Sequence, residues 1–317
     1  MEKVLNGAEE FSESCNMLKM VLALALYLGT IHFNLALIFF ATFFLPLSKA
    51  LLVFGSLLVL VMIPVDENSM FGRKLSKYIC RHICSYFPIT LHIEEVEAFR
   101  PNQAYVFGYE PHSVNPIGMI ALGHSAGFMP LAKTKLLASR AIFYIPFMRH
   151  TWTWLGFTSV SKKNFISSLA AGYSCIVVPG GIRETLFMEP GCENVFLKER
   201  RGFVRIALEM GLPLVPVFCF GQTDTYKWWK APGKLIQNLA RILKITPLFF
   251  WGIYGSPIPF KIPLYVVVGR PIKVEKNPQP TMDQVAKVHN QFVDELQDLF
   301  NRHKAQAGYT NLELKII

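Results

Sequence analysis

The chain has near its N-terminus an apolar run that is too long for an ordinary core helix. Residues 20–45 are almost entirely apolar, and after the break Pro46-Leu47-Ser48-Lys49 a second apolar run covers residues 50–64. A helix that spans a bilayer needs about 20 apolar residues, so the first run is long enough and the second is short. We therefore predict a membrane hairpin at residues 17–64, whose second arm either spans the bilayer or re-enters it.

The charges around this hairpin predict its orientation. The flanking cations are Lys19, Arg73, Lys74, Lys77 and Arg81. Because Lys and Arg concentrate on the cytosolic side of membrane helices, we expect both ends of the hairpin and both chain termini in the cytosol. Residues 1–16 are polar and acidic, which is unlike the basic start of a cleavable signal peptide, and we expect them to be disordered.

Residues 65–90 carry a basic amphipathic pattern. The apolar side chains at helical spacing are Phe71, Leu75, Ile79, Ile83 and Tyr86, with cations on another side. Such a helix commonly lies in the membrane interface, where its cations meet anionic headgroups. We predict an interface helix here, with a helix packed on the domain core as the alternative.

The composition limits the partners of the chain. Hydrophobic residues make up 52% of the 317 residues and charged residues 17%, whereas about 25% is usual in a soluble domain. The net charge of +10 fits an anionic membrane surface or a phosphorylated co-substrate. The sequence has no zinc-finger spacing, aromatic-basic RNA signature or long basic tail, so we predict no nucleic-acid partner.

From about residue 91 to the C-terminus the pattern alternates between strands and helices. The expected strands cover residues 104–109, 173–178, 214–220 and 264–269, and the expected helices cover residues 162–171, 202–210 and a last helix that begins at Thr281. Thr281 and Gln284 form a capping box for that helix. We predict an α/β domain with a mostly parallel sheet flanked by helices.

The cysteines favour a reduced, cytosolic domain. The six are Cys15, Cys80, Cys84, Cys175, Cys192 and Cys219. Their spacing shows no disulfide framework, and Cys175 and Cys219 lie in apolar runs typical of buried strands. Cys80, His82 and Cys84 offer too few ligands for a closed metal site, so we predict no metal.

The segment Tyr109-Glu110-Pro111-His112-Ser113 directly follows a predicted strand. Pro111 fixes its own φ and lacks an amide donor, so it ends the strand and stiffens the turn. In an extended stretch Glu110 and His112 point to the same side, where a carboxylate can orient the imidazole and raise its basicity. The pattern is that of a general base, although a lone histidine at a strand end is also compatible with a structural role.

Two further clusters carry groups that bind anions. In Pro179-Gly180-Gly181-Ile182-Arg183-Glu184 the glycines let backbone amides approach an oxyanion, Arg183 can bind anionic oxygens, and Glu184 is a second candidate partner for His112. In Lys198-Glu199-Arg200-Arg201-Gly202 the cations precede a helix and could take the phosphates of a nucleotide. A solvated basic loop is the alternative for the second cluster.

One motif suggests different chemistry. Gly123-His124-Ser125-Ala126-Gly127 matches the G-x-S-x-G elbow of lipases, and Asp224 and His289 could complete a triad. An elbow requires a strand before the serine and a long helix after it, but Pro130 follows within five residues. We therefore do not expect hydrolase chemistry at Ser125.

Several segments taken in order resemble the type-2 diacylglycerol acyltransferase family, and its plant branch in particular. They are YVFGYEPHSV at 105–114, IFYIPFMRHTWTWLG at 142–156, VVPGGIRET at 177–185, RRGFVRIALEMG at 200–211, PLVPVFCFGQ at 213–222 and VVVGRP at 266–271. Plant members keep Glu-Pro-His-Ser where animal members have His-Pro-His-Gly. The resemblance covers nearly the whole chain.

This resemblance implies transfer of an acyl group from acyl-CoA to diacylglycerol, at the endoplasmic reticulum and lipid droplets, without a cofactor. It implies His112 as the base, Glu110 or Glu184 as its partner, and a substrate-binding set that comprises Pro111, Ser113, Gly180, Gly181, Arg183, Arg200 and Arg201. The alternatives are a related acyltransferase on monoacylglycerol or a long-chain alcohol, and a non-catalytic hairpin protein of lipid droplets. Whether the chain forms a homo-oligomer stays open.

The domain also resembles, more remotely, the glycerolipid acyltransferases that carry a His-x4-Asp motif. This sequence departs from that motif, because the fifth residue after His112 is Ile117 and not Asp. The spacing alone therefore leaves the carboxylate partner of His112 open between Glu110 and Glu184. The C-terminal residues 312–317 are similar to endoplasmic-reticulum retrieval ends in plant relatives, with an ordinary frayed end as the alternative.

Overall fold

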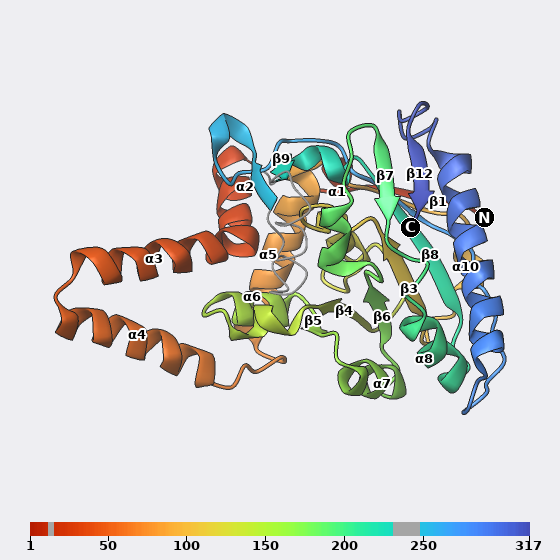
Figure 1. Ribbon diagram of the computed structural model, residues 1–317, viewed down its shortest axis with the longest axis horizontal. Helices are drawn as coiled ribbons and strands as arrows, with labels where there is room; N and C mark the ends of the chain where they lie inside the picture. Colours follow the sequence, from red (N-terminus) through yellow and green to blue (C-terminus); the bar gives the residue numbers. More distant parts are fainter. Residues whose placement is uncertain (12–15, 231–247) are drawn as a thin grey trace.

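The computed structural model describes residues 1–11, 16–230 and 248–317, and its centre is an eight-stranded sheet (Figure 1). In spatial order its strands are β1 (Lys3–Asn6), β2 (Thr90–Ile93), β11 (Tyr265–Val268), β8 (Leu214–Phe220), β3 (Val106–Glu110), β6 (Ser174–Val177), β4 (Thr134–Ala138) and β5 (Phe157–Ser159). The sheet is mixed: β1–β2 and β11–β8 pair antiparallel, and the other neighbours pair parallel. The carboxyl ends of β8, β3, β6, β4 and β5 therefore lie at one edge.

Two small sheets stand beside the central one. β9 (Lys227–Lys230) pairs antiparallel with β10 (Leu248–Trp251), and β7 (Cys192–Val195) pairs parallel with β12 (Glu313–Ile316). The structure thus builds the C-terminal residues into the fold, because Leu197 and Lys198 donate backbone hydrogen bonds to the Ile317 carbonyl. The frayed end offered as an alternative for residues 312–317 is wrong.

Helices cover both faces of the central sheet. They are α1 (Gly7–Glu10), α2 (Met17–Leu24), α3 (Thr30–Phe44), α4 (Leu47–Met62), α5 (Met70–Tyr86), α6 (Met148–Trp154), α7 (Lys162–Ala170), α8 (Gly202–Met210) and α10 (Met282–His303). Successive strand residues alternate between two apolar layers, as in any pleated strand: Val217 packs with the layer under α2, α5 and α6, and Phe218 with the layer under α7, α8 and α10. The domain is therefore a three-layer α/β structure.

The local signals of the sequence placed several elements correctly. Strands β3, β6, β8 and β11 lie within or close to the predicted ranges, and α8 has the predicted bounds. Gly211 ends α8 in the left-handed conformation, at φ +68°, and Thr281 forms the predicted capping box with Gln284. Cys175 and Cys219 are buried in β6 and β8, as expected, whereas Cys15 lies outside the described residues.

The N-terminal residues differ from the prediction of disorder. Lys3–Asn6 forms β1, which extends the central sheet by pairing with β2, and Gly7–Glu10 forms the short helix α1. Composition did not reveal this strand because an edge strand is stabilised by backbone hydrogen bonds to its neighbour, which do not require apolar side chains.

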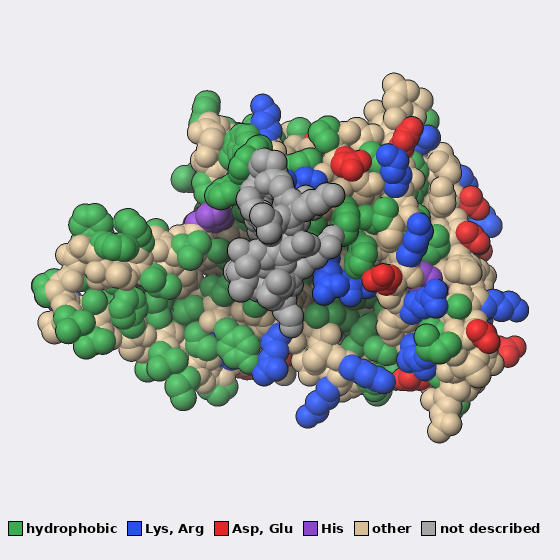
Figure 2. All heavy atoms as spheres, viewed as in Figure 1, with side chains coloured by type: hydrophobic (Ala, Val, Ile, Leu, Met, Phe, Trp, Pro, Cys, Tyr) green, Lys and Arg blue, Asp and Glu red, His purple; other side chains and the backbone are tan. Residues whose placement is uncertain are grey.

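The N-terminal apolar run is divided into a packed and a projecting part. Met17–Phe44 is the one helical stretch among the described residues that is long and apolar enough to cross a membrane, and α4 is shorter. A π-helical turn at Ala25–Gly29 separates α2 from α3, which turns away from the body alongside α4 (Figure 1). Exposed hydrophobic side chains cover the α3–α4 projection (Figure 2).

The packed part of the run is buried against α5 and α6. The Tyr27 ring stacks on Trp152 with 5.5 Å between ring centroids, and Trp152 Nε1 donates a hydrogen bond to the Tyr27 carbonyl. Asn34 donates to the Pro146 carbonyl at 3.0 Å, close to the point where the projection leaves the domain. The polar residue in the apolar run thus anchors α3 to the domain.

Helix α5 corrects the prediction of an interface helix. Its apolar face, with Ile79, Ile83 and Tyr86, is buried in the domain core, which is the alternative arrangement. Met70 and Phe71 at its first turn are exposed, next to the end of α4. The amphipathic pattern was correct, but the apolar surface that it faces is that of the protein.

Candidate active site

The loop that carries His112 begins at the carboxyl end of β3, between β8 and β6. The Glu110–Pro111 peptide bond is cis, and Ser113 has a positive φ of 52°. β3 is buried along its whole length, and His112 is half-buried at its end. The fold therefore presents the imidazole at the edge where the parallel strands end, the usual place of ligand sites in α/β sheets.

The imidazole of His112 is held by a backbone carbonyl. Its Nδ1 lies 2.8 Å from the Ser113 carbonyl oxygen. A carbonyl only accepts hydrogen bonds, so Nδ1 carries the hydrogen and Nε2 carries the lone pair. Burial lowers the pKa of His112 from its ordinary value of 6.5, against a smaller opposite effect of the Ser113 carbonyl. The ring is thus a neutral base with Nε2 as its basic atom.

Glu184 holds the backbone of the His112 loop. The His112 N–H donates to Glu184 Oε2 at 2.6 Å, and the Phe196 N–H donates to Oε1 at 3.0 Å. Glu184 itself is 1% exposed and lies in the 3-10 helix Gly181–Leu186 after β6. Glu184 was predicted as a candidate partner of the imidazole, and its carboxylate contacts the main chain of His112 rather than the ring.

Glu110 is also buried and is not bonded to the imidazole. Its Oε1 accepts a hydrogen bond from the Gly180 N–H at 3.4 Å. Burial, together with the neighbouring Glu184 carboxylate, raises the pKa of Glu110 well above its ordinary value of 4.5. Two ionised carboxylates would repel each other in one buried site, and this repulsion is avoided if Glu110 is protonated and donates a hydrogen bond to Glu184. The prediction that Glu110 orients the ring is therefore wrong.

The turn at Gly180 and Gly181 after β6 leaves space for these carboxyl groups because it has no side chains. A Cβ on Gly180 would lie 2.0 Å from Glu184 Oε1, so only glycine fits there. The Gly180 N–H is already bonded to Glu110, which leaves Gly181, at φ +58°, as the oxyanion candidate of the pair.

The three predicted anion-binding arginines have different surroundings. Arg183 and Arg201 are exposed. Arg200 is half-buried, with its guanidinium 4.9 Å from the centroid of the Phe196 ring and Nη2 3.5 Å from the Gly180 carbonyl. Arg200 therefore supports the glycine turn, and Arg183 and Arg201 remain the cations that a phosphate can approach.

Gln222 closes the His112 loop from the side of β8. Its Nε2 donates to the Pro111 carbonyl, and its Oε1 accepts from the Tyr109 hydroxyl at 2.5 Å and from the Gly118 N–H at 3.1 Å. Sequence reasoning missed this residue, although it ends the strand segment PLVPVFCFGQ. A polar residue at a strand end next to the base was the signal that could have found it.

A hydrogen-bonded chain leads from the His112 loop to β7, and it was also missed. Ser113 Oγ lies 2.6 Å from Thr223 Oγ1, which donates to Glu193 Oε2 at 2.9 Å. Since Thr223 has one hydroxyl hydrogen, Ser113 is the donor in the first bond. Burial raises the pKa of Glu193 to about 7. Ser113 was expected to contact substrate, and its hydroxyl is instead bonded to Thr223.

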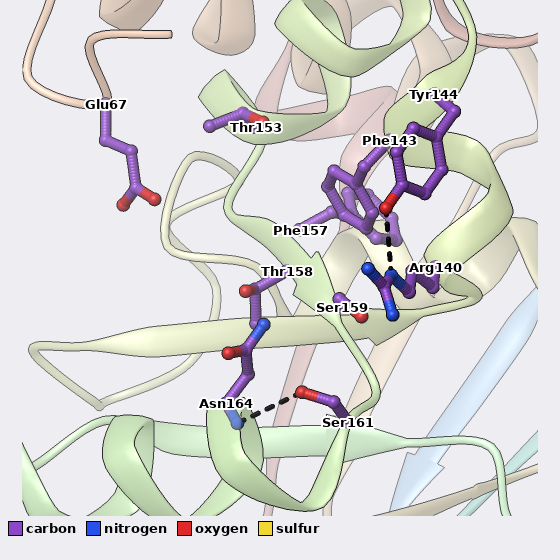
Figure 3. A pocket seen from close by; sticks show the side chains of 10 residues that line it. All are labelled: Glu67, Arg140, Phe143, Tyr144, Thr153, Phe157, Thr158, Ser159, Ser161 and Asn164. Atoms are coloured by element: carbon purple, nitrogen blue, oxygen red, sulfur yellow. Dashed lines mark hydrogen bonds between the residues drawn. The ribbon is translucent and has the colours of Figure 1, made fainter. Parts of the chain in front are cut away.

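Two of the cavities on the described domain differ in their relation to the His112 loop. One of about 430 Å³ lies beyond the ends of β4 and β5, where Arg140 Nε donates to the Tyr144 hydroxyl and the Asn164 N–H donates to Ser161 Oγ (Figure 3). The other, of about 550 Å³, is lined by Thr223 and Glu193. The second cavity is thus joined to the His112 loop by the chain of hydrogen bonds through Thr223.

The structure does not support hydrolase chemistry at Ser125. This residue follows the 3-10 helix Ile117–Leu122 and is not at the end of a strand, and its hydroxyl donates to Ser76 at 3.0 Å. Of the other triad candidates, His289 Nε2 bonds the Leu197 carbonyl and Asp224 accepts from Tyr309. The three residues are engaged separately, as expected from the missing elbow.

Known proteins resemble the chain over most of its length. A family model described as diacylglycerol acyltransferase matches residues 40–316. Diacylglycerol O-acyltransferase 1 of Schizosaccharomyces pombe is 32% identical, covering 89% of this chain and 87% of the relative. Diacylglycerol O-acyltransferase 2 of Dictyostelium discoideum is 34% identical, with 74% and 76% covered, and 2-acylglycerol O-acyltransferase 1 of Bos taurus is 34% identical, with 75% and 76% covered.

The chain also resembles solved structures distantly. Among them is the 1-acyl-sn-glycerophosphate acyltransferase PlsC from Thermotoga maritima, with 17% identity, a TM-score of 0.42, and coverage of 84% of this chain and 96% of the other. The narrower resemblance to the plant branch stays a prediction. The family match over residues 40–316 and relatives above 30% identity establish that this chain belongs to the diacylglycerol acyltransferase family and is an acyltransferase.

Proposed function

We propose that this chain transfers an acyl group from acyl-CoA to the free hydroxyl of diacylglycerol, with His112 as the general base. The observation that carries the proposal is the hydrogen bond between His112 Nδ1 and the Ser113 carbonyl. It leaves Nε2 of a neutral imidazole, at the end of β3, as the atom that can take a hydroxyl proton.

The reaction then follows in two steps. As the diacylglycerol oxygen attacks the thioester carbonyl carbon, its proton moves to His112 Nε2 and the carbonyl oxygen becomes an oxyanion. The intermediate collapses when the carbon–sulfur bond breaks, and the departing thiolate of coenzyme A takes the proton from the imidazolium. The products are triacylglycerol and free coenzyme A, and the step uses no metal or prosthetic group.

Groups around His112 have candidate roles in this step. The Gly181 N–H is the candidate donor to the oxyanion, and the exposed Arg183 and Arg201 are candidates for the phosphates of coenzyme A. Glu184 acts through the backbone: it accepts from the His112 N–H and so fixes where the ring stands. Glu184 is therefore a positioning residue.

The projecting α3–α4 pair supports a location at a membrane. Most of its exposed side chains, such as Phe39 and Phe43, are apolar, and contact with lipid would remove that area from water. We propose that the pair inserts into the endoplasmic-reticulum membrane, with the catalytic domain in the cytosol, and that the chain also reaches lipid droplets.

A second acceptor has specific support. The 2-acylglycerol O-acyltransferase 1 of Bos taurus matches the chain at 34% identity, which is similar to the values for the diacylglycerol relatives. Monoacylglycerol is therefore the alternative acceptor for the same His112 chemistry.

Expression in a yeast that makes no triacylglycerol of its own tests the proposal. We expect the wild type to restore triacylglycerol on lipid chromatography and His112→Ala to leave it absent. Membranes incubated with radiolabelled acyl-CoA and either diacylglycerol, monoacylglycerol or a long-chain alcohol then identify the acceptor. Near-normal activity of His112→Ala would refute the base, and inactivity of the wild type with every acceptor would favour a non-catalytic droplet protein.

A further inference from the structure

The cavity of about 550 Å³ is bounded by the turn before β7, by the β9–β10 sheet and by the segment after α10. Its walls are rich in aromatic side chains: Tyr226, Trp228, Trp251 and Tyr309. A cavity of this size lies within the range of about 300–1,000 Å³ that is usual for sites of small ligands, which are mostly apolar with a few polar groups. The cavity therefore has a volume that is usual for a ligand site.

The polar groups of this cavity are connected to the catalytic base. Thr223 and Glu193 line the cavity, and Thr223 accepts the hydroxyl of Ser113, whose carbonyl holds His112 Nδ1. Ser113 has a strained backbone conformation, with φ +52°, so its position depends on such contacts. A ligand that contacts Thr223 therefore contacts the residue that is hydrogen-bonded to Ser113 of the His112 loop.

The charge of the cavity favours the uncharged lipid acceptor over acyl-CoA as its ligand. Its carboxyl groups are Glu189, Glu193 and Asp224, against one cation, Lys227. A polyanionic nucleotide such as that of coenzyme A is repelled by such a lining, and the exposed Arg183 and Arg201 lie elsewhere. An uncharged lipid with hydroxyl and ester groups avoids this repulsion, and aromatic walls suit its apolar part.

Glu193 has the properties that a hydroxyl ligand requires. It is buried, its Oε2 accepts from Thr223, and burial raises its pKa to about 7. Its carboxyl group can therefore accept from a hydroxyl when ionised, or donate to a hydroxyl or ester oxygen when protonated.

We infer that this cavity binds the acyl acceptor, an uncharged glycerolipid with a free hydroxyl, and that Thr223 couples the bound acceptor to the His112 loop through Ser113. The inference rests on the proposed function, because it assigns a place to one of the two proposed substrates. His112 does not line the cavity, so the bound acceptor extends past Thr223 and Ser113 to bring its free hydroxyl to the imidazole, and its long chains extend beyond the cavity.

Two neighbouring tryptophans provide a matched test. Trp228 lines the cavity, whereas Trp229 on the same strand points to the other side, is 50% exposed and contacts Phe249. In the purified full-length enzyme we expect Trp228→Ala to raise the KM for diacylglycerol about tenfold and to leave the KM for acyl-CoA within about twofold. Trp229→Ala is expected to change neither constant.

The inference is overturned if Trp228→Ala raises the KM for acyl-CoA instead, or if the two tryptophan variants behave alike.

The role of the Thr223 hydroxyl in the coupling is tested by a separate pair of variants. Thr223→Val should lower kcat about tenfold, because it breaks the link between Ser113 and Glu193, and Thr223→Ser should restore it. Equal kcat values for Thr223→Val and Thr223→Ser would refute the coupling of the acceptor to the His112 loop through Thr223.

A labelling experiment covers the case in which a variant does not fold. A photoreactive diacylglycerol analogue, bound to the wild-type enzyme and competed by diacylglycerol, should label peptides that contain residues 223–228 or 309–312. Labelling confined to other peptides overturns the inference. If the wild type labels there but transfers no acyl group to any acceptor, the proposed function fails and the binding site stands.

Discussion

The projecting α3–α4 pair and the His112 loop differ in what holds their polar groups and what they expose. On the projection, Phe43 and Phe44 are 69% and 67% exposed, and Thr42 donates a hydrogen bond to a carbonyl of its own helix. Around the loop, Glu110 at the end of β3 and Gln222 after β8 are 0% and 1% exposed, and each bonds residues from other strands or turns. The projection exposes an apolar surface, whereas buried hydrogen bonds around the loop hold the His112 imidazole in place.

This difference predicts different responses to substitution. A residue of the projection contributes through the surface that it presents, so a change there should alter membrane contact and not the fold. A residue of the loop contributes through buried hydrogen bonds, and removing one partner leaves the other unsatisfied at a cost of about 1–3 kcal/mol.

The largest effect is expected at the base itself. His112→Ala should lower acyl transfer by about 100-fold or more, because an alanine side chain cannot take the hydroxyl proton, while the protein remains in the membrane fraction. Radiolabelled acyl-CoA assays on washed membranes measure both properties. Ser125→Ala is the control and should keep normal activity, and a loss of activity there would point back to hydrolase-type chemistry.

The next effect concerns the carboxylate behind the loop. Glu184→Ala should destabilise the protein by about 3 kcal/mol, because the N–H groups of His112 and Phe196 lose their acceptor, and should reduce activity as the ring loses its position. Glu184→Gln keeps one acceptor oxygen and should be milder in both respects. Thermal unfolding and kcat measure these effects, and an alanine variant with wild-type kcat would show that the position of the ring does not depend on Glu184.

A matched pair of aromatic residues compares the packed and projecting parts of the apolar run. Tyr27→Ala removes a ring that is 2% exposed and stacked on Trp152, so we expect a loss of about 3 kcal/mol of stability in detergent. Phe43→Asp should change stability by less than about 0.5 kcal/mol in detergent, yet weaken binding to lipid vesicles. Equal destabilisation by both changes would mean that the projection is packed against protein.

The smallest effect is the pH dependence of the base. The reaction requires neutral His112, so kcat/KM should rise with pH as the imidazolium loses its proton. Because burial lowers the pKa of His112, the midpoint of this rise in the free enzyme should lie below pH 6.5. A pH profile of kcat/KM, with thermal unfolding followed over the same range, measures it. A midpoint above pH 6.5 would contradict the lowered pKa of His112.

The sequence predicted those features that depend on neighbours along the chain. The apolar run, the cap of the last helix at Thr281, the end of α8 at Gly211 and the strand before His112 all follow from local pattern. His112 was found because a histidine after a rigid proline at a strand end is a local signal. Local pattern could not find β1, whose partner β2 begins more than 80 residues later.

The tertiary structure decided which groups meet at the base. The sequence offered two carboxylates as partners for the imidazole, and the ring instead bonds the Ser113 carbonyl, whose direction depends on a backbone conformation that no side chain reveals. Glu184, Gln222 and Thr223 reach the loop from 72 to 111 residues away in the chain, across the parallel strands β6 and β8. By itself the sequence determined where the base lies, whereas only the packing of distant strands determined what holds it.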